Sequence, residues 1–310
     1  MTGKNRSAQS LGIAAMCAAM FMLPMGDALT KLITRVLHPT DVTAIRSVIQ
    51  LAALGLAALA LRKLLSGRSL SWLSLASGLL NAVISLSLIT AFKFMPIATA
   101  IAIFFVEPLL LTILAGPFLG ERPGPRRYVA VAVGMIGTLI ILRPNFSEFG
   151  WVVALPLIAA LAFAFNMIVT RKATRHSSPL SFQIGASLFG ASALVAISLL
   201  QPAEAVGPLA ALSAAPGWVL IGLVASGALA ALSFLTLTYA FAQAEASVLA
   251  PFQYLEILGA TLVGYVVFGD GLDGLTLLGT LIVLGSGLYV IHRERRAEQD
   301  IRITPARADR

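Results

Sequence analysis

The stretch of sequence that decides the fold occurs twice. Residues 91–122 read AFKFMPIATAIAIFFVEPLLLTILAGPFLGER, and residues 240–271 read AFAQAEASVLAPFQYLEILGATLVGYVVFGDG. Aligned from their first residues, the two stretches place Glu107 opposite Glu256 and Gly120 opposite Gly269. Because a carboxylate is rare inside an apolar run, its recurrence at an equivalent place indicates an internal repeat.

The repeat extends beyond these stretches. GTLIILR from Gly137 matches GLYVIHR from Gly287, and Pro39 matches Pro179. The predicted repeat units are therefore residues 11–143 and residues 150–293. The remaining residues, 294–310, are mixed in charge, and we expect them to form a disordered tail.

The composition indicates an integral membrane protein. Of 310 residues, 58% are hydrophobic and 12% are charged, against about 25% charged in soluble domains. Crossing a membrane takes about 20 apolar residues in a helix. Ten such spans are predicted: residues 11–33, 42–61, 70–92, 97–118, 128–143, 150–170, 180–200, 217–240, 247–268 and 274–291. They leave no room for a soluble catalytic domain, so we expect an all-α membrane protein.

The charge distribution predicts the topology. Each repeat holds five spans, an odd number, so the two copies must be inverted relative to each other in the bilayer. The loop GERPGPRR after the fourth span is basic, whereas its counterpart GDGLDGLT has no Lys or Arg. Most of the 22 Lys and Arg residues follow even-numbered spans or lie at the termini, which predicts that both termini are cytoplasmic. The net charge of +8 thus reflects topology, and we expect no nucleic-acid partner.

The sequence lacks the usual signatures of an enzyme or a metal site. The single cysteine, Cys17, cannot form an internal disulfide, and the three histidines fall at predicted span ends. There is no HExxH, GxSxG or GxGD motif and no nucleotide-binding signature. We therefore expect no metal, no cofactor and no enzymatic activity; a multispan membrane enzyme is the disfavoured alternative.

The chain resembles the EamA-type permeases of the drug/metabolite transporter superfamily. The resemblance rests on the ten spans in two halves, the VEP followed by GER in the first repeat, and the IRS that opens the second span. The second half departs from this pattern, because Ile257 follows Glu256 and GDG replaces GER. The resemblance implies a secondary transporter of the bacterial inner membrane that works by alternating access.

The resemblance also suggests a solute. The superfamily includes amino-acid exporters, nucleotide-sugar carriers, S-adenosylmethionine uptake carriers and riboflavin importers. GDALTKL in the first span looks most like the vitamin and S-adenosylmethionine uptake branches. Aromatic residues flank both glutamates, so riboflavin uptake is the first hypothesis; S-adenosylmethionine uptake and metabolite efflux are the alternatives. A proton as coupling ion and a homodimer are further partners that the sequence permits.

Charged side chains inside spans are candidate site residues, because they are expensive in the membrane. Glu107 and Glu256 lie near the centres of their spans. They either face a cavity between the halves or brace a helix that Pro108 interrupts. Asp27 and Lys31 lie four residues apart on one face and are expected to pair at the outer vestibule, or Lys31 reaches the headgroups instead.

Arg46 and four uncharged polar residues complete the predicted site. Arg46 either binds an anionic or carbonyl group of the solute, anchors at the headgroups, or pairs with Asp41. Uncharged polar residues at membrane depth are candidates for the lining of the cavity, with helix packing as the alternative: Asn81, Asn166, Tyr239 and Gln253.

Overall fold

The structure is a computed structural model. It describes residues 3–94, 97–121, 123–142, 150–200, 213 and 215–263, together with residues 265, 266, 274, 275, 277–279, 281–283, 285, 286 and 289. The regular structure of these residues is helical, and they contain no strand. The α-helices are α1 (Gly3–Ile33), α2 (Pro39–Ala60), α3 (Trp72–Phe94), α4 (Ile97–Phe104), α5 (Glu107–Leu119), α6 (Pro125–Leu142), α7 (Ala154–Ala173), α8 (Pro179–Leu200), α10 (Gly217–Gln243), α11 (Ala246–Gln253) and α12 (Leu255–Val263), with short 3₁₀ turns at Arg62–Leu64 and Gly150–Val153.

The chain is a multi-pass membrane protein. Within the part of the chain that the structure describes, five helices are long and apolar enough to cross a membrane: Ala8–Thr30, Thr40–Ala60, Gly150–Ala173, Pro179–Leu200 and Gly217–Gln243. They coincide with the first, second, sixth, seventh and eighth predicted spans. Shorter apolar helices cover Trp72–Leu88 and Glu107–Leu119. The tenth predicted span is described only in part, and the predicted tail lies outside the described residues, so the count of ten and the tail stay predictions.

The fourth and ninth predicted spans are each broken into two helices, α4 and α5 in the fourth and α11 and α12 in the ninth. Phe105 and Val106 form a turn between α4 and α5. Pro108 follows at the start of α5, where the missing N–H of proline costs no intrahelical bond. Tyr254 separates α11 from α12. Both breaks therefore lie immediately before the two glutamates that the repeat aligns.

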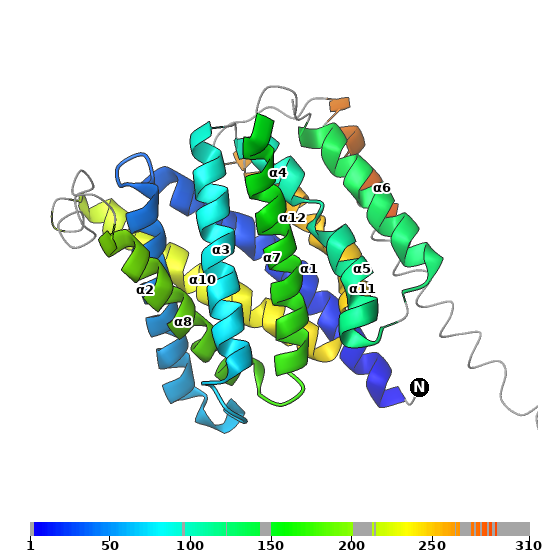
Figure 1. Cartoon of the computed structure of the whole chain (residues 1–310), viewed down its shortest axis with the longest axis horizontal. Coiled ribbons are helices and arrows are strands. Elements are labelled where there is room, and N and C mark those ends of the chain that lie inside the picture. The colour runs from blue at the N-terminus through cyan, green and yellow to red at the C-terminus, as the bar shows by residue number, and fades with distance from the viewer. Residues whose placement is uncertain are drawn as a thin grey trace, which may run out of the picture.

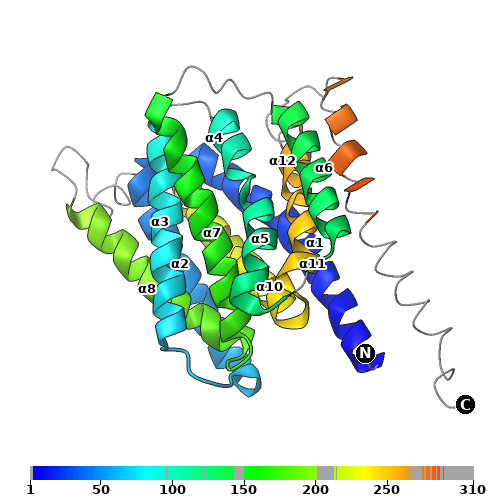
Figure 2. The same ribbon diagram turned by 45° about the vertical axis from the view of Figure 1, so that its right-hand side comes forward.

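The helices pack in pairs that the repeat relates to one another. Helix α1 packs on α10 while its counterpart α7 packs on α3, and α2 packs on α10 while α8 packs on α3. Helix α12 contacts α1 as α5 contacts α7. Figures 1 and 2 show α3 and α7 side by side, with α2 and α8 on one flank and α5, α6, α11 and α12 on the other. This pairing is the one that a two-fold relation between the halves produces.

The basic loops after the second and sixth spans lie together at one end of the bundle. The Ser178 N–H donates to the Ser66 carbonyl at 2.9 Å, and the Ser177 hydroxyl donates to the Arg68 carbonyl at 3.2 Å. The N-terminal end of α1 points to the same end of the molecule, the lower edge of Figure 1. The basic loops and the N-terminal end of α1 thus lie at the same end of the molecule.

The GER motif joins the two halves at this basic end. Gly120 ends α5 in the left-handed conformation, with φ of 70°, which glycine adopts without steric cost. The next residue, Glu121, accepts the N–H groups of Ala246 and Ser247, both at 2.9 Å. These N–H groups open α11 and have no partner inside the helix, so the carboxylate satisfies them and complements the helix dipole.

Two arginines tie the same region together. Arg127 donates to the Glu245 carboxylate at 3.1 Å and to the Ser247 hydroxyl at 2.7 Å. Arg171 donates to the carbonyls of Phe241 and Ala242 at 2.6 and 3.0 Å, which belong to the last turn of α10, where carbonyls lack a partner inside the helix. The turn between α10 and α11 is therefore held from α5, α6 and α7.

Candidate functional site

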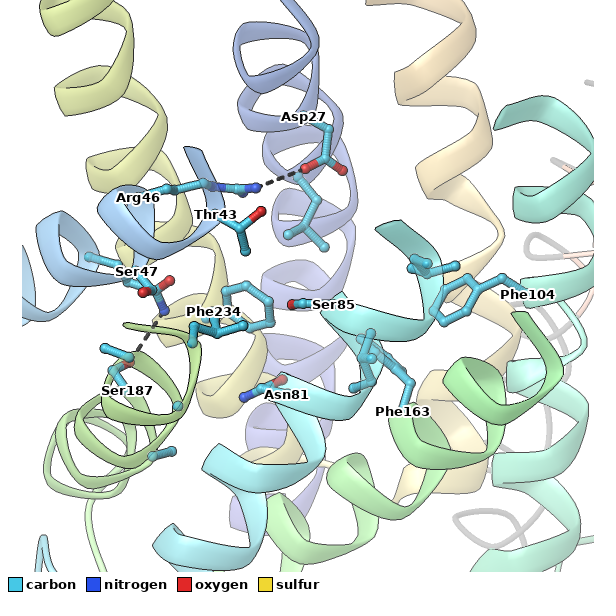
Figure 3. A pocket seen from close by; sticks show the side chains of 18 of the residues that line it. Asp27, Thr43, Arg46, Ser47, Asn81, Ser85, Phe104, Phe163, Ser187 and Phe234 are labelled. Atoms are coloured by element: carbon cyan, nitrogen blue, oxygen red, sulfur yellow. Dashed lines mark hydrogen bonds and ion pairs between the residues drawn. The ribbon is translucent and has the colours of Figure 1, made fainter. Parts of the chain in front are cut away.

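A cavity of about 220 Å³ lies between helices of both halves. Its walls come from α1, α2, α3, α4, α7, α8, α10 and α12. Four of the predicted site residues line it: Asp27, Arg46, Asn81 and Glu256. Figure 3 shows Phe104 and Phe163 on one side of the cavity and Arg46, Ser47 and Ser187 on the other. The cavity therefore has an aromatic wall that faces a polar one.

The ion pair at the cavity joins α1 to α2. Arg46 Nη1 lies 3.4 Å from Asp27 Oδ1, as Figure 3 shows. The alternative partner of Arg46, Asp41, is buried and accepts a hydrogen bond from Ser198 Oγ at 2.8 Å instead.

The side chain of Lys31 lies outside the described residues, so its predicted pairing with Asp27 stays a prediction. The Asp27 side chain is 58% exposed. A pair this exposed contributes under about 1 kcal/mol to stability. Its charges remain available to a solute, because the attraction between the two groups is weak enough to be exchanged for another contact.

Asn81 is held in place by a chain of buried hydrogen bonds. Ser77 Oγ donates to Asn166 Oδ1 at 2.6 Å, and Asn166 Nδ2 donates to Asn81 Oδ1 at 2.9 Å. Asn166 is buried behind Asn81, and it does not line the cavity. Asn166, which the sequence analysis offered as a lining residue, thus lies behind the lining and orients Asn81 from α7.

A second amide group is held in a similar way on the opposite wall. Gln50 Nε2 donates to Ser187 Oγ at 3.3 Å, and both residues line the cavity. Gln183 Nε2 also approaches Ser187 Oγ, at 3.4 Å, and Thr238 Oγ1 donates to Gln183 Oε1 at 3.0 Å. This network spans α2, α8 and α10, so it places polar groups on the cavity from both halves.

The aromatic wall consists of Phe104 and Phe163, whereas Phe234 lines the cavity on the side of Ser47 and Ser187, as Figure 3 shows. The rings of Phe104 and Phe163 meet edge to face, with centroids 5.6 Å apart. The turn after Phe104 ends α4, and this short helix directs the ring toward α7. Such a wall suits a planar ring system, because aromatic side chains stack on π-faces with little loss of conformational entropy.

The two aligned glutamates have different surroundings. Glu256 lines the cavity, and no described residue forms a hydrogen bond or ion pair with it. Glu107 is 3% exposed and does not line the cavity. Its carboxylate accepts a hydrogen bond from Gln253 Nε2 at 3.3 Å. Glu256 therefore belongs to the candidate binding site, while Glu107 and Gln253 form a separate buried pair.

Tyr239 lies away from the cavity. It is on α10 with 38% of its surface exposed, and it does not contribute to the lining. Phe234 and Thr238 on the same helix face inward. Because each residue turns a helix by about 100°, the residue after Thr238 points in a different direction.

The lining contains further residues that the sequence prediction omitted. Thr43, Ser47 and Gln50 line the cavity beside Arg46, and Ser85 lines it beside Asn81. The signal for these residues is their spacing, since positions three, four and seven apart share one face of a helix. On α8 the lining is formed by Ala186, Ser187, Gly190, Ala191 and Leu194, and no embedded charge marks that helix in the sequence.

Comparisons with known proteins agree with this architecture. The EamA-like transporter family matches residues 10–143 and 150–291. A solved crystal structure of a protein 20% identical in sequence covers 93% of this chain and 99% of its own, with a TM-score of 0.76. At this identity the likeness concerns the fold alone.

Curated relatives carry the names of transporters and not of enzymes. The Riboflavin transporter of Rhizobium johnstonii is 32% identical over 205 residues, which are 66% of this chain and 65% of that protein. The S-adenosylmethionine uptake transporter of Rickettsia felis is 29% identical over 65% of each chain, and the Riboflavin transporter of Vibrio cholerae is 31% identical over 65% of this chain and 64% of its own. The match thus spans just under two thirds of the length of these relatives. Because the family match covers nearly the whole chain in two copies, the protein belongs to the EamA-like transporter family.

Proposed function

We propose that the protein is a secondary transporter of the bacterial inner membrane that carries a small amphipathic organic solute by alternating access. The observation that carries this proposal is the composition of the cavity, which combines an aromatic wall with supported amides and an ion pair. Riboflavin uptake is the first candidate activity. A flavin ring suits the wall of Phe104 and Phe163, and its polar edge suits the amides of Asn81 and Gln50.

The size of the cavity supports a carrier that changes shape. At about 220 Å³, the cavity is smaller than the roughly 300–1,000 Å³ of typical ligand pockets. A vitamin-sized solute therefore needs the helices around the cavity to separate. The breaks before Glu107 and Glu256 provide short helices that can move separately from their neighbours, as the discontinuous helices of other transporters do.

S-adenosylmethionine uptake is the second candidate, and the charge of the lining favours it. The lining holds two carboxylates, on Asp27 and Glu256, and one guanidinium, on Arg46. This arrangement complements a solute that carries both a carboxylate and positive groups. Neutral riboflavin has no positive group for a carboxyl group in the lining to bind, so the two candidates predict different effects of Glu256.

We infer the orientation from the basic end of the bundle. By the positive-inside rule the end that carries the loops around Arg68 and Arg175 faces the cytoplasm, and with it the N-terminus. The two halves, residues 11–143 and 150–293, then form inverted repeats. Efflux, proton coupling and a homodimer are compatible with this arrangement, and the direction of transport is a question for assay.

The proposal is tested with the purified protein in liposomes. Uptake of labelled riboflavin and S-adenosylmethionine is measured beside Phe163→Ala and its control Phe165→Ala. Phe165 lies on the same helix but packs on Phe118, with centroids 5.3 Å apart, away from the cavity. We expect Phe163→Ala to weaken riboflavin uptake by about 2- to 10-fold, from a stacking contribution of roughly 0.5–1.5 kcal/mol, and Phe165→Ala to leave the solute affinity unchanged.

The same assay separates the two solutes. Glu256→Gln is expected to lower S-adenosylmethionine uptake selectively if that compound is carried, and to leave riboflavin uptake intact. Saturable uptake of neither compound, in either direction of loading, contradicts both candidate activities. Equal loss in Phe163→Ala and Phe165→Ala contradicts the assignment of the cavity as the binding site.

A further inference from the structure

Glu107 and Gln253 form a buried pair between the two halves. Glu107 is the first residue of α5 and Gln253 is the last residue of α11. Gln253 Nε2 donates to Glu107 Oε1 at 3.3 Å, and each residue is 3% exposed. The pair lies outside the cavity lining, so the solute-binding site does not account for it.

No cation faces Glu107 within the described part of the chain. Helix α5 packs against α6, α7 and α11. The ionisable groups that interact electrostatically with Glu107 are another carboxyl group, Glu256, and the hydroxyl of Tyr254, and neither can be a cation. The remaining titratable groups of these elements lie at the basic end of the bundle: Glu121, Arg126, Arg127, Tyr128, Arg171, Lys172 and Glu245.

The separation from that basic end is large. Lys172 Nζ lies 5.8 Å from the centre of the Phe118 ring. Phe118 is three turns beyond Glu107 on α5, a distance of about 16 Å along the axis. An ionised Glu107 would thus be a charge without a counter-charge in a site shielded from water, which is strongly unfavourable.

The unpaired oxygen of Gln253 gives the second observation. Within the described residues, Gln253 Oε1 is buried and has no hydrogen-bond partner. A buried acceptor that lacks a donor destabilises the folded protein. A carboxylate cannot supply that donor, whereas a carboxylic acid can, because its O–H donates while its carbonyl oxygen accepts.

We infer that Glu107 carries a proton in this conformation and that the Glu107–Gln253 pair is the proton-binding site of the carrier. The acid O–H donates to Gln253 Oε1 while Gln253 Nε2 donates to the acid carbonyl. This cyclic pair satisfies the unpaired oxygen and removes the buried charge in one step. The role of the pair in transport rests on the proposed function, whereas the protonation of Glu107 does not.

The repeat explains why the proton belongs to one glutamate and the solute to the other. The alignment that places Glu107 opposite Glu256 also places Phe104 opposite Gln253. Glu256 therefore meets no amide at the equivalent position, and both Glu256 and Phe104 line the cavity. A single difference between the halves thus separates a proton site from a solute site.

The position of the pair links the proton to the transport cycle. Because α5 and α11 belong to different halves, a movement that separates the halves removes the amide from the acid and admits water. The acid then releases its proton to that water and becomes a carboxylate. When the halves return and the site opens to the opposite side of the membrane, the carboxylate takes up one proton from the water there. Release on one side and uptake on the other thus move one proton across the membrane in each cycle.

Infrared spectroscopy of the purified protein tests the protonation without any solute. The difference spectrum between the wild type and Glu107→Gln at neutral pH is expected to contain the C=O stretch of a carboxylic acid. The control, Glu121→Gln, is expected to remove only the bands of an ionised carboxylate, because Glu121 accepts two backbone N–H groups. Loss of ionised-carboxylate bands in Glu107→Gln overturns the inference.

Gln253→Leu provides a second variant that keeps Glu107. It removes the acceptor, so the acid C=O band is expected to shift toward that of an acid with a weaker hydrogen bond. An acid band that does not move in Gln253→Leu contradicts the pairing. This test remains decisive if Glu107→Gln fails to fold.

Transport measurements then test the coupling. With a tenfold proton gradient, one-to-one coupling gives up to about tenfold accumulation of a neutral solute. Glu107→Gln keeps the shape of the protonated pair, so it is expected to exchange labelled for unlabelled solute but to reach an accumulation ratio near one. Accumulation equal to the wild type overturns the inference. Absence of all transport by the wild type contradicts the proposed function instead, while the infrared result still decides the protonation.

Discussion

Replacing Asn166 with leucine tests whether the solute site is positioned from behind. The change keeps the branching and the number of side-chain heavy atoms but removes two hydrogen bonds, from Ser77 Oγ at 2.6 Å and to Asn81 Oδ1 at 2.9 Å. In a water-soluble protein, each buried polar group left without a partner would lower the free energy of unfolding by about 1–3 kcal/mol. Inside a membrane the unfolded helices also find partners, and interhelical hydrogen bonds average about 0.6 kcal/mol. The smaller value applies to these buried helices, so we expect Asn166→Leu to lower the free energy of unfolding by about 1 kcal/mol.

The assay is denaturation by detergent titration of the reconstituted protein, combined with solute uptake. Ser77→Ala is the matched control, because it removes one of the two bonds and leaves Asn81 supported. We expect Ser77→Ala to change stability by about half as much and to leave the KM for the solute unchanged, whereas Asn166→Leu raises that KM. If Asn166→Leu leaves both stability and KM unchanged, the reasoning about a supporting chain is refuted.

Three further predictions address the charges and contacts around the site and the joints between helices. Glu121→Gln, which keeps one acceptor but loses the charge at the start of α11, is expected to lower thermal stability by about 0.5–1 kcal/mol, and an unchanged melting temperature contradicts the capping role. Gly78→Ala is expected to cost about 1–3 kcal/mol, because the added methyl would lie 2.7 Å from the Ala186 carbonyl oxygen; its control Gly55→Ala meets nothing within 4 Å and is expected to be neutral or stabilising in the same melt. Asp27→Asn is expected to change stability by less than 1 kcal/mol while weakening uptake of a cationic solute relative to a neutral one, and a matched loss for both solutes contradicts the electrostatic role.

Much of the fold could be predicted from the sequence because composition and charge act over whole spans. The apolar runs at 150–170 and 217–240 coincide with α7 and α10, and the aligned carboxylates mark both helix breaks. The break before Glu256 was harder to predict, since no proline follows that residue. Pro251 lies inside α11, on the N-terminal side of this break. Its missing N–H removes one helix hydrogen bond there.

The site was predicted less completely, because the direction of a side chain depends on how its helix is rotated. Asp27, Arg46, Asn81 and Glu256 line the cavity as predicted, since a charged or amide group at membrane depth is excluded from lipid whatever the rotation. Gln253 met the same criterion, yet it lies beside Glu107 and not on the cavity. Spacing along one helix cannot distinguish these two outcomes, because both faces of α11 are covered by protein.

The difference between the two glutamates shows how a repeat can give rise to two sites. Identical halves would place both carboxylates in the same surroundings, so both would bind solute or both would brace a helix break. The halves differ at one pair of equivalent positions, where the first has the aromatic Phe104 and the second has the amide Gln253. This difference gives the two glutamates different surroundings. The amide draws Glu107 into a hydrogen-bonded pair between the halves, while the ring leaves Glu256 facing the cavity. Phe105 and Tyr254, the residues of the two breaks, contact each other with ring centroids 6.1 Å apart. We therefore expect a movement at the proposed solute site beside Glu256 to reach Glu107 through this contact between equivalent residues.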